Sequence, residues 1–349
     1  MRISRSASIV ADVQVIDNFS TSAWDHVETR SIVTIGAYDG LHVGHRLVID
    51  QVVAEARESG CQSVLVTFDR HPASLVRPES APKLLTDHAQ KIELLAQTGL
   101  DAVAVVTFDQ QQAAESPEDF VRRVLVECLK VDTIVVGEDF HFGKARAGNV
   151  ALLRELGHRY GFKVEPLQLL TVSDGAVASS TFIRELITQG NIEIANRYLG
   201  HIFEIRGTVA HGDQRGRTIG FPTANVEVPV TMCIPADGVY AAWYVRLVAG
   251  KEETYPCAIN IGRRPTFYEN APVSLIEAHI IGETDLDLYG EVAVLRFVTR
   301  LRGEQKFAGL EEMKTQLAID VANASELKVS KGEVEFNNVS FAYTGKNEV

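Results

Sequence analysis

The chain has 349 residues, 46% of them hydrophobic, and a formal net charge of −12. It is longer than most single domains and apolar enough for two cores, so we expect two domains. The acidic balance argues against a nucleic-acid-binding protein, which would normally show a basic stripe or patch, and no apolar run approaches the ~18 residues that cross a bilayer.

The cysteines and the first residues bear on where the protein works. Cys61, Cys128, Cys233 and Cys257 lie far apart and form no Cys-x-x-Cys pair. This spacing predicts neither a zinc site nor a disulfide framework, which favours a reducing cytoplasm. The first residues lack the sustained apolar stretch of a targeting segment. We expect a cytoplasmic monomer or transient homo-oligomer without nucleic-acid or membrane partners.

From residue 31 to about residue 170, short β-branched runs alternate with helical patterns. Strands are predicted at 31–36, 63–69, 101–109, 132–140 and 162–170. Because these runs are almost continuously apolar, they indicate strands buried on both faces, as in a parallel sheet covered by helices. Thr86 or Asp87 can cap a helix that Gly99 can end. This half is predicted to be a doubly wound α/β domain.

The pattern changes after two short predicted helices, at 180–189 and 191–199, which we interpret as a hinge between domains. Strands follow at 202–210, 238–248, 254–262, 274–281 and 291–301. Because glycine-rich or polar turns separate them and no helices intervene, they predict a small antiparallel β-barrel. An amphipathic helix at 310–324 closes it. The fold class is therefore α/β plus β.

The first predicted strand runs into a glycine-rich turn that carries His42 and His45. A strand-to-helix turn at the edge of a parallel sheet presents backbone N–H groups and the positive helix end, which suits a nucleotide phosphate. The spacing places both imidazoles on one face of the first helical turn. The pattern is neither Walker A nor G-x-G-x-x-G, which disfavours both of those nucleotide folds. Taken alone, two capping histidines explain it equally well.

Two further segments offer polar groups to this half. Ser180 and Thr181 open a predicted helix, and Arg184 lies one turn in, where a guanidinium can hold a leaving pyrophosphate. An N-cap serine and a solvated arginine are the simpler alternative. Asp69 and His71 follow the second strand, where ligands usually meet a parallel sheet. A turn aspartate and a spacer before proline fit them as well.

Residues 211–225 combine three glycines and two arginines and end in Pro-Thr-Ala-Asn. This composition predicts a flexible, cationic loop whose Thr223 and Asn225 suit a magnesium-nucleotide. The alternative is a solvated hairpin loop, which the Pro-Thr-Ala-Asn ending disfavours.

Strand alternation in 274–281 gives Leu275, Glu277 and His279 one face. A mid-strand carboxylate beside a nucleotide loop can accept the proton of an attacking hydroxyl. A solvent-facing glutamate on an edge strand is the alternative for Glu277.

The first half resembles the nucleotidylyltransferase domain of the prokaryotic bifunctional riboflavin kinase/FAD synthetases. The motifs that carry the resemblance occur in family order: GAYDGLHVGH, VTFDRHP, VGEDFHFGKARAGN and SSTFIREL. Family members more often have Asn-Phe where Ala37-Tyr38 stands. The resemblance implies that the FMN phosphate attacks the α-phosphorus of ATP and expels pyrophosphate. Positioning and charge stabilisation, with magnesium, would supply most of the catalysis.

The same resemblance implies roles for individual residues. His42 and His45 would contact the ATP phosphates, and Arg184 would steady the β- and γ-phosphates. Further nucleotide contacts are implied for Gly36, Asp39, Gly40, Gly44, Gly137, Ser180 and Thr181. Flavin-side positions are implied for Asp69, His71, Asp139 and Phe142.

From about residue 190 to 322 the chain resembles the riboflavin kinase domain of the same family. The matching motifs are GTVAHGDQRGRTIGFPTANV, GVYAAW, AINIGRRPTF, EAHI, DLYG and LRGEQKF. The resemblance implies transfer of the ATP γ-phosphoryl group to riboflavin. Glu277 would be the general base on the 5′-hydroxyl, and Thr223 and Asn225 would hold magnesium and the ATP phosphates.

The kinase resemblance also covers the loop and its flanks. Nucleotide contacts are implied for Gly207, Gly212, Arg217 and Gly220, the glycines letting the loop close over the phosphates. Arg302 either helps to define the flavin site or is a solvated surface arginine.

The predicted domains are an FMN adenylyltransferase at 1–188, a riboflavin kinase at 189–324 and an extra tail at 325–349. The tail piece GEVEFNNVSFAYTG resembles the opening strands of an ABC-transporter ATPase domain, including Tyr343, which usually stacks on adenine in such domains. Without a Walker A loop, this fragment cannot hydrolyse ATP. We expect the tail to be disordered.

The leading prediction is thus a bifunctional enzyme with riboflavin, FMN and ATP as substrates and Mg²⁺ as its metal. One alternative is a monofunctional FAD synthetase whose barrel senses flavin; the pairing of Pro-Thr-Ala-Asn with Glu277 argues against it. The other is a non-catalytic flavin-binding protein, which would have no use for His42, His45 and Arg184 around a phosphate-transfer centre.

Overall fold

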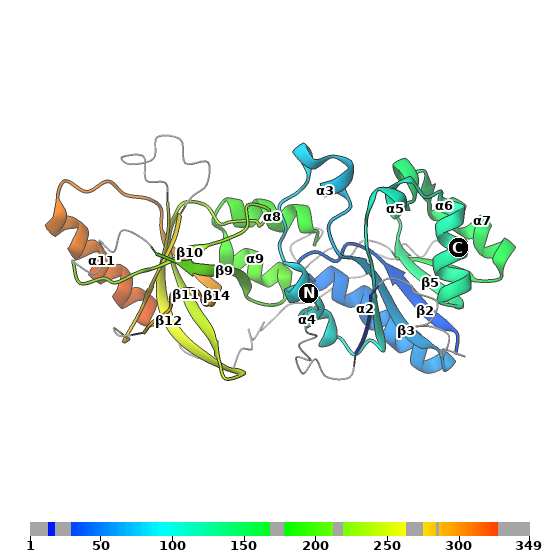
Figure 1. Cartoon of the computed structure of the whole chain (residues 1–349), viewed down its shortest axis with the longest axis horizontal. Helices are drawn as coiled ribbons and strands as arrows, with labels where there is room; N and C mark the ends of the chain where they lie inside the picture. Colours follow the sequence, from blue (N-terminus) through cyan, green and yellow to red (C-terminus); the bar gives the residue numbers. More distant parts are fainter. Residues whose placement is uncertain are drawn as a thin grey trace, which may run out of the picture. The chain divides into compact units, whose positions relative to one another are not determined.

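The computed structural model describes residues 13–17, 29–167, 178–211, 219–262, 275–283 and 286–326 (Figure 1). These residues divide into two compact units, one ending at Ala178 and the next beginning at Ser179. No helix among them has both the length and the apolar character needed to cross a bilayer. Gly212, Arg217 and the tail from residue 327 lie outside the described residues.

The first unit is built on a parallel six-stranded sheet in the order β1-β4-β3-β2-β5-β8. Its strands are β1 Gln14–Asp17, β2 Ser31–Ile35, β3 Gln62–Phe68, β4 Ala102–Val106, β5 Val131–Gly137 and β8 Lys163–Leu167. From β2 the chain adds β3 and β4 on one side and then returns to the other side of β2 with β5. The topological switch point therefore lies between β2 and β5, and open parallel sheets bind ligands outside the carboxyl ends of their strands at such a point.

Helices cover both faces of this sheet (Figure 1). They are α2 Val43–Ser59, α3 Ala73–Val76, α4 His88–Ala96, α5 Gln110–Ala114, α6 Pro117–Phe120, the π-helical η2 Val121–Cys128 and α7 Val150–Tyr160, with short 3₁₀ turns at Pro78–Ser80 and Lys144–Arg146. Ile32, Leu65 and Val103 pack with α2 and α4, whereas the alternate strand residues pack with η2 and α7. Because each strand feeds two cores, β2 and β4 are buried along their whole length. The predicted doubly wound α/β domain is confirmed.

The start of α4 follows a strong local signal. The Asp87 carboxylate accepts a hydrogen bond from the Gln90 N–H, and the Gln90 side chain accepts one from the Asp87 N–H, each at 2.8 Å. This reciprocal capping box satisfies two backbone donors at the helix start. Thr86, the other predicted cap, instead donates to Asp39.

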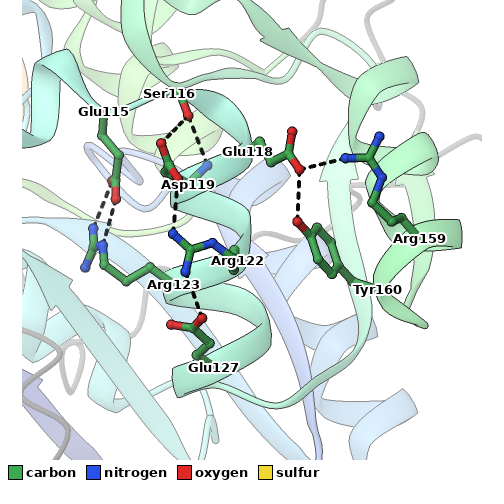
Figure 2. A network of polar contacts seen from close by, with 9 residues as sticks. All are labelled: Glu115, Ser116, Glu118, Asp119, Arg122, Arg123, Glu127, Arg159 and Tyr160. Carbon is green, nitrogen blue, oxygen red and sulfur yellow. Dashed lines mark hydrogen bonds and ion pairs between the residues drawn. The ribbon is translucent and has the colours of Figure 1, made fainter.

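A chain of exposed ion pairs joins the helices on the η2 side (Figure 2). Glu118 accepts hydrogen bonds from Arg159 at 2.6 Å and from the Tyr160 hydroxyl at 3.0 Å, which links α6 to α7. Arg122 bridges Asp119 and Glu127. Because these pairs face water, each contributes little to stability, and the apolar core beneath holds the helices in place.

The second unit is a closed antiparallel barrel in the order β10-β13-β12-β11-β14-β9. Its strands are β9 Phe203–Ala210, β10 Ala224–Glu227, β11 Gly238–Val248, β12 Lys251–Gly262, β13 Leu275–Ile280 and β14 Val292–Arg302. Helix α11, Leu310–Ser325, packs outside β11 and β12, where Ala324 meets Ala241 and Ala258 (Figure 1). The predicted barrel with a closing helix is confirmed.

Two details of the second half differ from the sequence predictions. Helices α8 Ser180–Thr188 and α9 Ile192–Leu199 belong to the second unit rather than to a separate hinge. Buried Asn196 fastens α9, because its amide donates to the Phe297 carbonyl at 2.9 Å and accepts from the Phe203 N–H at 2.8 Å. Ala224 and Asn225, which the sequence analysis places at the end of a loop, are the first residues of strand β10, which closes the barrel between β13 and β9.

Candidate active sites

The turn between β2 and α2 lies at the switch point of the parallel sheet. Its backbone is strained, because Tyr38 and Leu41 adopt φ values of +49° and +36°. A Cβ on Gly36 would lie 2.9 Å from the Tyr38 ring, so only glycine lets the ring fold back over the strand end. Gly40, at φ +82°, completes this turn, and Gly44 lies in the first turn of α2, whose start the turn presents at the sheet edge.

His42 and His45 lie together, as their spacing predicts. His42 is the buried N-cap of α2, and its Nδ1 accepts the His45 N–H at 3.3 Å. That bond leaves the proton of neutral His42 on Nε2, the nitrogen able to donate to a phosphate oxygen. The two rings stack at a centroid distance of 3.6 Å. The capping role and a ligand-binding role are therefore compatible in one residue.

Tyr38 packs against His45 at the base of the turn. Its ring centroid lies 4.8 Å from that of His45, and its hydroxyl shares a 2.5 Å hydrogen bond with Thr34 on β2. Burial raises the pKa of the Tyr38 hydroxyl well above its ordinary value. A phenol at this position therefore stays neutral, and its hydrogen bond holds the ring against the turn.

Asp39 anchors the turn from the other side. Its carboxylate is 5% exposed and accepts hydrogen bonds from the N–H groups of Leu85 and Thr86, each at 3.0 Å, and from the Thr86 hydroxyl at 3.1 Å. Gly40 N–H in turn donates to Thr86. Asp39 thus binds backbone groups that precede α4, and a direct nucleotide contact stays a prediction.

Lys91 is a part of this site that the sequence analysis missed. It is 8% exposed, and its ammonium donates to the carbonyl of Phe68 at 2.7 Å, the hydroxyl of Thr67 at 3.2 Å and the carbonyl of Ala37 at 3.4 Å. Burial lowers the pKa of Lys91 to about 8, although Asp39 and Asp69 oppose the shift. The sequence offered one signal for it: Lys91 lies on the apolar face of the predicted helix, where a charged residue is unusual.

Asp69 and His71 lie at the carboxyl end of β3, beside a small cavity that Lys91 also lines. Asp69 accepts the Phe108 N–H at 2.9 Å, which ties the segments after β3 and β4 together. His71 Nδ1 accepts the Ala73 N–H at 3.1 Å, at the start of α3. Both therefore shape the loop, and their contact with flavin stays a prediction.

The strand end at Gly137 and the hairpin that follows border the same sheet edge. The hairpin pairs β6 His141–Phe142 with β7 Gly148–Asn149. Asp139 is exposed and folds back toward Gly137. Phe142, in contrast, is 8% exposed within the core that includes Phe120. The core therefore surrounds the Phe142 ring, and a contact of Phe142 with flavin stays a prediction.

Ser180, Thr181 and Arg184 lie in the first turns of α8, in the second unit. Ser179 caps the helix, since its side chain accepts the Phe182 N–H at 3.2 Å. Arg184 lies one turn in, as predicted. The joint action of these residues with the histidines of the first unit stays a prediction.

The barrel has a cavity of about 670 Å³ on its outer face, beneath α11 and the segment before it. Thr223, Glu277, His279 and Arg302 all contribute to its wall. The remainder is largely apolar, including Phe221, Val239, Ala258, Phe307, Met313 and Leu317. A largely apolar cleft of this size with a few convergent polar groups is typical of a small-molecule site.

Glu277 occupies the middle of a row that crosses three strands. On β13 it is the direct partner of Asn225 on β10 and of Asn260 on β12. Directly opposed residues have Cβ atoms ~4.5–5.5 Å apart, so the carboxylate lies between two amides. Because β10 and β12 flank β13 on both sides, the edge-strand alternative for Glu277 is wrong. Asn260 was not singled out in the sequence.

Arg302 has a structural partner that the sequence did not reveal. Its guanidinium donates to both carboxylate oxygens of Asp320 on α11, at 2.7–3.1 Å. The Asp320 side chain is 3% exposed and that of Arg302 is 19% exposed. Arg302 also lies over the Phe307 ring, 5.7 Å from its centroid. The solvated-arginine alternative is therefore wrong, because Arg302 fastens the closing helix beside the cavity.

Gly207 and Gly220 differ in what they do. Gly220 has φ +89° just before the Pro-Thr-Ala-Asn segment, consistent with a turn. Gly207 lies within β9, where a Cβ would come 2.4 Å from the Glu227 carbonyl oxygen on β10. Gly207 is thus glycine because β9 and β10 approach too closely there for a side chain, and its contribution to nucleotide binding stays a prediction.

The side chains near Glu277 can be compared with the ligands that magnesium prefers. The described residues contain no group of three or more His, Cys, Asp or Glu side chains that could hold a metal ion alone. Magnesium, however, binds few protein oxygens and keeps water and substrate phosphates as its other ligands. The Thr223 hydroxyl and Asn225 amide beside Glu277 fit such a magnesium-nucleotide.

Comparison with known proteins agrees with both halves. Residues 25–181 match the FAD synthetase family model, and residues 199–328 match the riboflavin kinase family model. The bifunctional riboflavin kinase/FMN adenylyltransferase of Escherichia coli strain K12 is 38% identical over 296 residues, covering 84% of this chain and 92% of that protein. The enzyme of the same name from Bacillus subtilis strain 168 is 34% identical over 300 residues, covering 85% and 92%.

A solved structure shares the fold. The crystal structure of a macrolide-efflux protein from Streptococcus pneumoniae matches with a TM-score of 0.76 and 26% identity, covering 90% of this chain and 100% of that chain. With both family domains present and relatives of this identity over most of its length, the chain belongs to the family of bifunctional riboflavin kinase/FMN adenylyltransferases, which use ATP to make FMN from riboflavin and FAD from FMN.

Proposed function

We propose that the two reactions use two separate sites with the residues assigned above. The β2–α2 turn serves FMN adenylylation, and the outer cavity of the barrel serves riboflavin phosphorylation. The observation that carries this division is the cross-strand pairing of Asn225 with Glu277 beside the cavity, within the second unit. The Pro-Thr-Ala-Asn segment and Glu277 lie side by side within the second unit, and no residue of the turn with His42 and His45 is needed to bring them together.

In the adenylylation, the FMN phosphate attacks the α-phosphorus of ATP and pyrophosphate leaves. His42 and His45 donate hydrogen bonds to the phosphate oxygens as negative charge grows on them, and the start of α2 adds its backbone N–H groups. The stacked rings and the Nε2 proton of His42 support this role. Arg184 holds the β- and γ-phosphates of the leaving group.

In the phosphorylation, Glu277 accepts the proton of the riboflavin 5′-hydroxyl while that oxygen attacks the γ-phosphorus of ATP. The apolar wall of the cavity supports flavin binding, with Arg302 at its edge. Thr223 and Asn225 would hold Mg²⁺ and the ATP phosphates. The ion would neutralise phosphate charge when bound.

The remaining assignments concern the surroundings of the protein. All four cysteines are free thiols and Cys233 and Cys257 are buried, which supports a reducing cytoplasm. The net charge of −12 supports a chain that avoids nucleic acid and acts as a monomer or transient homo-oligomer. We retain 1–188 and 189–324 as the limits of the two functional domains in this proposal, with α8 counted in the first by function although its contacts group it with the second compact unit.

A time course tests both reactions at once. Purified protein is incubated with riboflavin, ATP and Mg²⁺, and FMN and FAD are separated by chromatography. We expect FMN first and FAD after it. FAD formed only when FMN is supplied would favour a flavin-sensing barrel, and no product from either flavin would favour a binding protein.

A further inference from the structure

His279 makes a contact that the two proposed reactions do not use. It lies on β13 two residues after Glu277, on the same face, and lines the same cavity. Its Nδ1 lies 2.7 Å from the Pro222 carbonyl oxygen. Because a carbonyl only accepts, Nδ1 is the protonated nitrogen. The Phe221 ring packs edge-on against the imidazole at 5.6 Å.

The contact falls where strand pairing stops. The pairing of β10 with β13 begins with Ala224 opposite Ala278. Pro222 and Thr223 precede that pair, and proline has no N–H with which to extend the ladder. The hydrogen bond from His279 to Pro222 therefore prolongs the attachment of this segment to β13 through a side chain. Thr223 lies between that bond and the first paired residue, so both of its neighbours are held.

We propose that His279 is a positioning residue for the kinase reaction. Through Pro222 it holds the Thr223 hydroxyl and the Asn225 amide in register with the Glu277 carboxylate. The inference rests on the proposed assignment of Thr223 and Asn225 to the magnesium-nucleotide. His279 itself need not touch substrate, because its Nδ1–H is already committed to the protein.

Three substitutions separate this role from a direct one. Asn places its amide nitrogen near the position of Nδ1, whereas Gln places it near that of Nε2. We expect His279→Asn to stay within a few-fold of the wild type. His279→Gln and His279→Ala should raise the KM for Mg-ATP in riboflavin phosphorylation by about 10-fold to 100-fold, with a smaller change in kcat. Thermal unfolding of each variant and its FAD formation from supplied FMN should be unchanged.

A control variant and two defined outcomes decide whether the inference fails. His201→Ala, a histidine of the same unit that does not line the cavity, should behave as wild type. Activity retained by His279→Gln and lost by His279→Asn would overturn the inference in favour of a direct role for Nε2. Wild-type behaviour of all three variants would also overturn it.

Thr223→Val distinguishes failure of the inference from failure of the assignment beneath it. If Thr223→Val raises the KM for Mg-ATP and the His279 variants do not, only the inference fails. If Thr223→Val leaves that KM unchanged, the assignment of Thr223 to the magnesium-nucleotide fails. The proposed positioning of Thr223 by His279 through Pro222 then fails as well.

Discussion

Asn225 and Glu277 are direct partners across β10 and β13, although 51 residues separate them in the chain. The pairing brings the end of the Pro-Thr-Ala-Asn segment to the one carboxylate in the middle of β13. It arises because the barrel closes through β10, which pairs with both β13 and β9, so that the two residues share one face of neighbouring strands.

Glu277→Gln should remove the proposed base while preserving shape and hydrogen-bonding capacity. We expect riboflavin phosphorylation to fall by about 10²–10⁴-fold, the usual range for a general base. FAD formation from supplied FMN should persist, because none of the residues proposed for adenylylation is Glu277 or lies on β13. Initial rates of the two reactions in one preparation check this. Loss of both activities in a folded variant would contradict the division into two sites.

His45→Ala should impair FAD formation by about 10²–10³-fold and leave FMN formation unchanged, since a donor to the charged phosphate is lost. His42→Ala should have the same kinetic effect and also cost about 1 kcal/mol of stability, because His42 caps α2. His42→Asn provides the control, as asparagine is a good cap but a different phosphate donor. Normal FAD synthesis by His45→Ala would refute the role proposed for it.

Lys91 predicts a particular pH dependence of stability. Its pKa is about 8 in the folded protein against 10.5 ordinarily, so between these values the unfolded chain binds more protons than the folded one. The free energy of unfolding therefore rises with pH across this window, by on the order of 1–3 kcal/mol. Lys91→Met should lack this rise. Urea unfolding of both proteins at pH 7.5 and 10 checks it; parallel curves would show that Lys91 keeps its ordinary pKa.

Arg302→Met should leave the Asp320 carboxylate buried without its cation, which costs about 3–5 kcal/mol. The double variant Arg302→Met, Asp320→Leu should regain most of that stability in thermal unfolding. If Arg302 also contacts the flavin, the double variant will still have a raised KM for riboflavin. A wild-type KM in that stable double variant would restrict Arg302 to holding α11.

Local patterns were sufficient for much of the architecture. Continuous apolar runs predicted the parallel sheet, alternation placed Glu277 and His279 on one face, and Asp87 capped its helix, because each signal depends on near neighbours in the chain. The strand-to-helix turn that carries His42 and His45 was likewise predicted from the local sequence. The roles of its residues toward nucleotide and flavin stay predictions, as do the domain limits.

The tertiary structure alone decided which partners these faces meet. Lys91 reaches Ala37 over 54 positions, Arg302 binds Asp320 rather than water, and Gly207 is glycine because β10 passes close by. Phe142 is in a core that no local motif announces. Periodicity shows which face of a helix or strand is buried, but not which segment packs against that face. The packing partner is set by contacts between segments far apart in the sequence, so only the tertiary structure shows it.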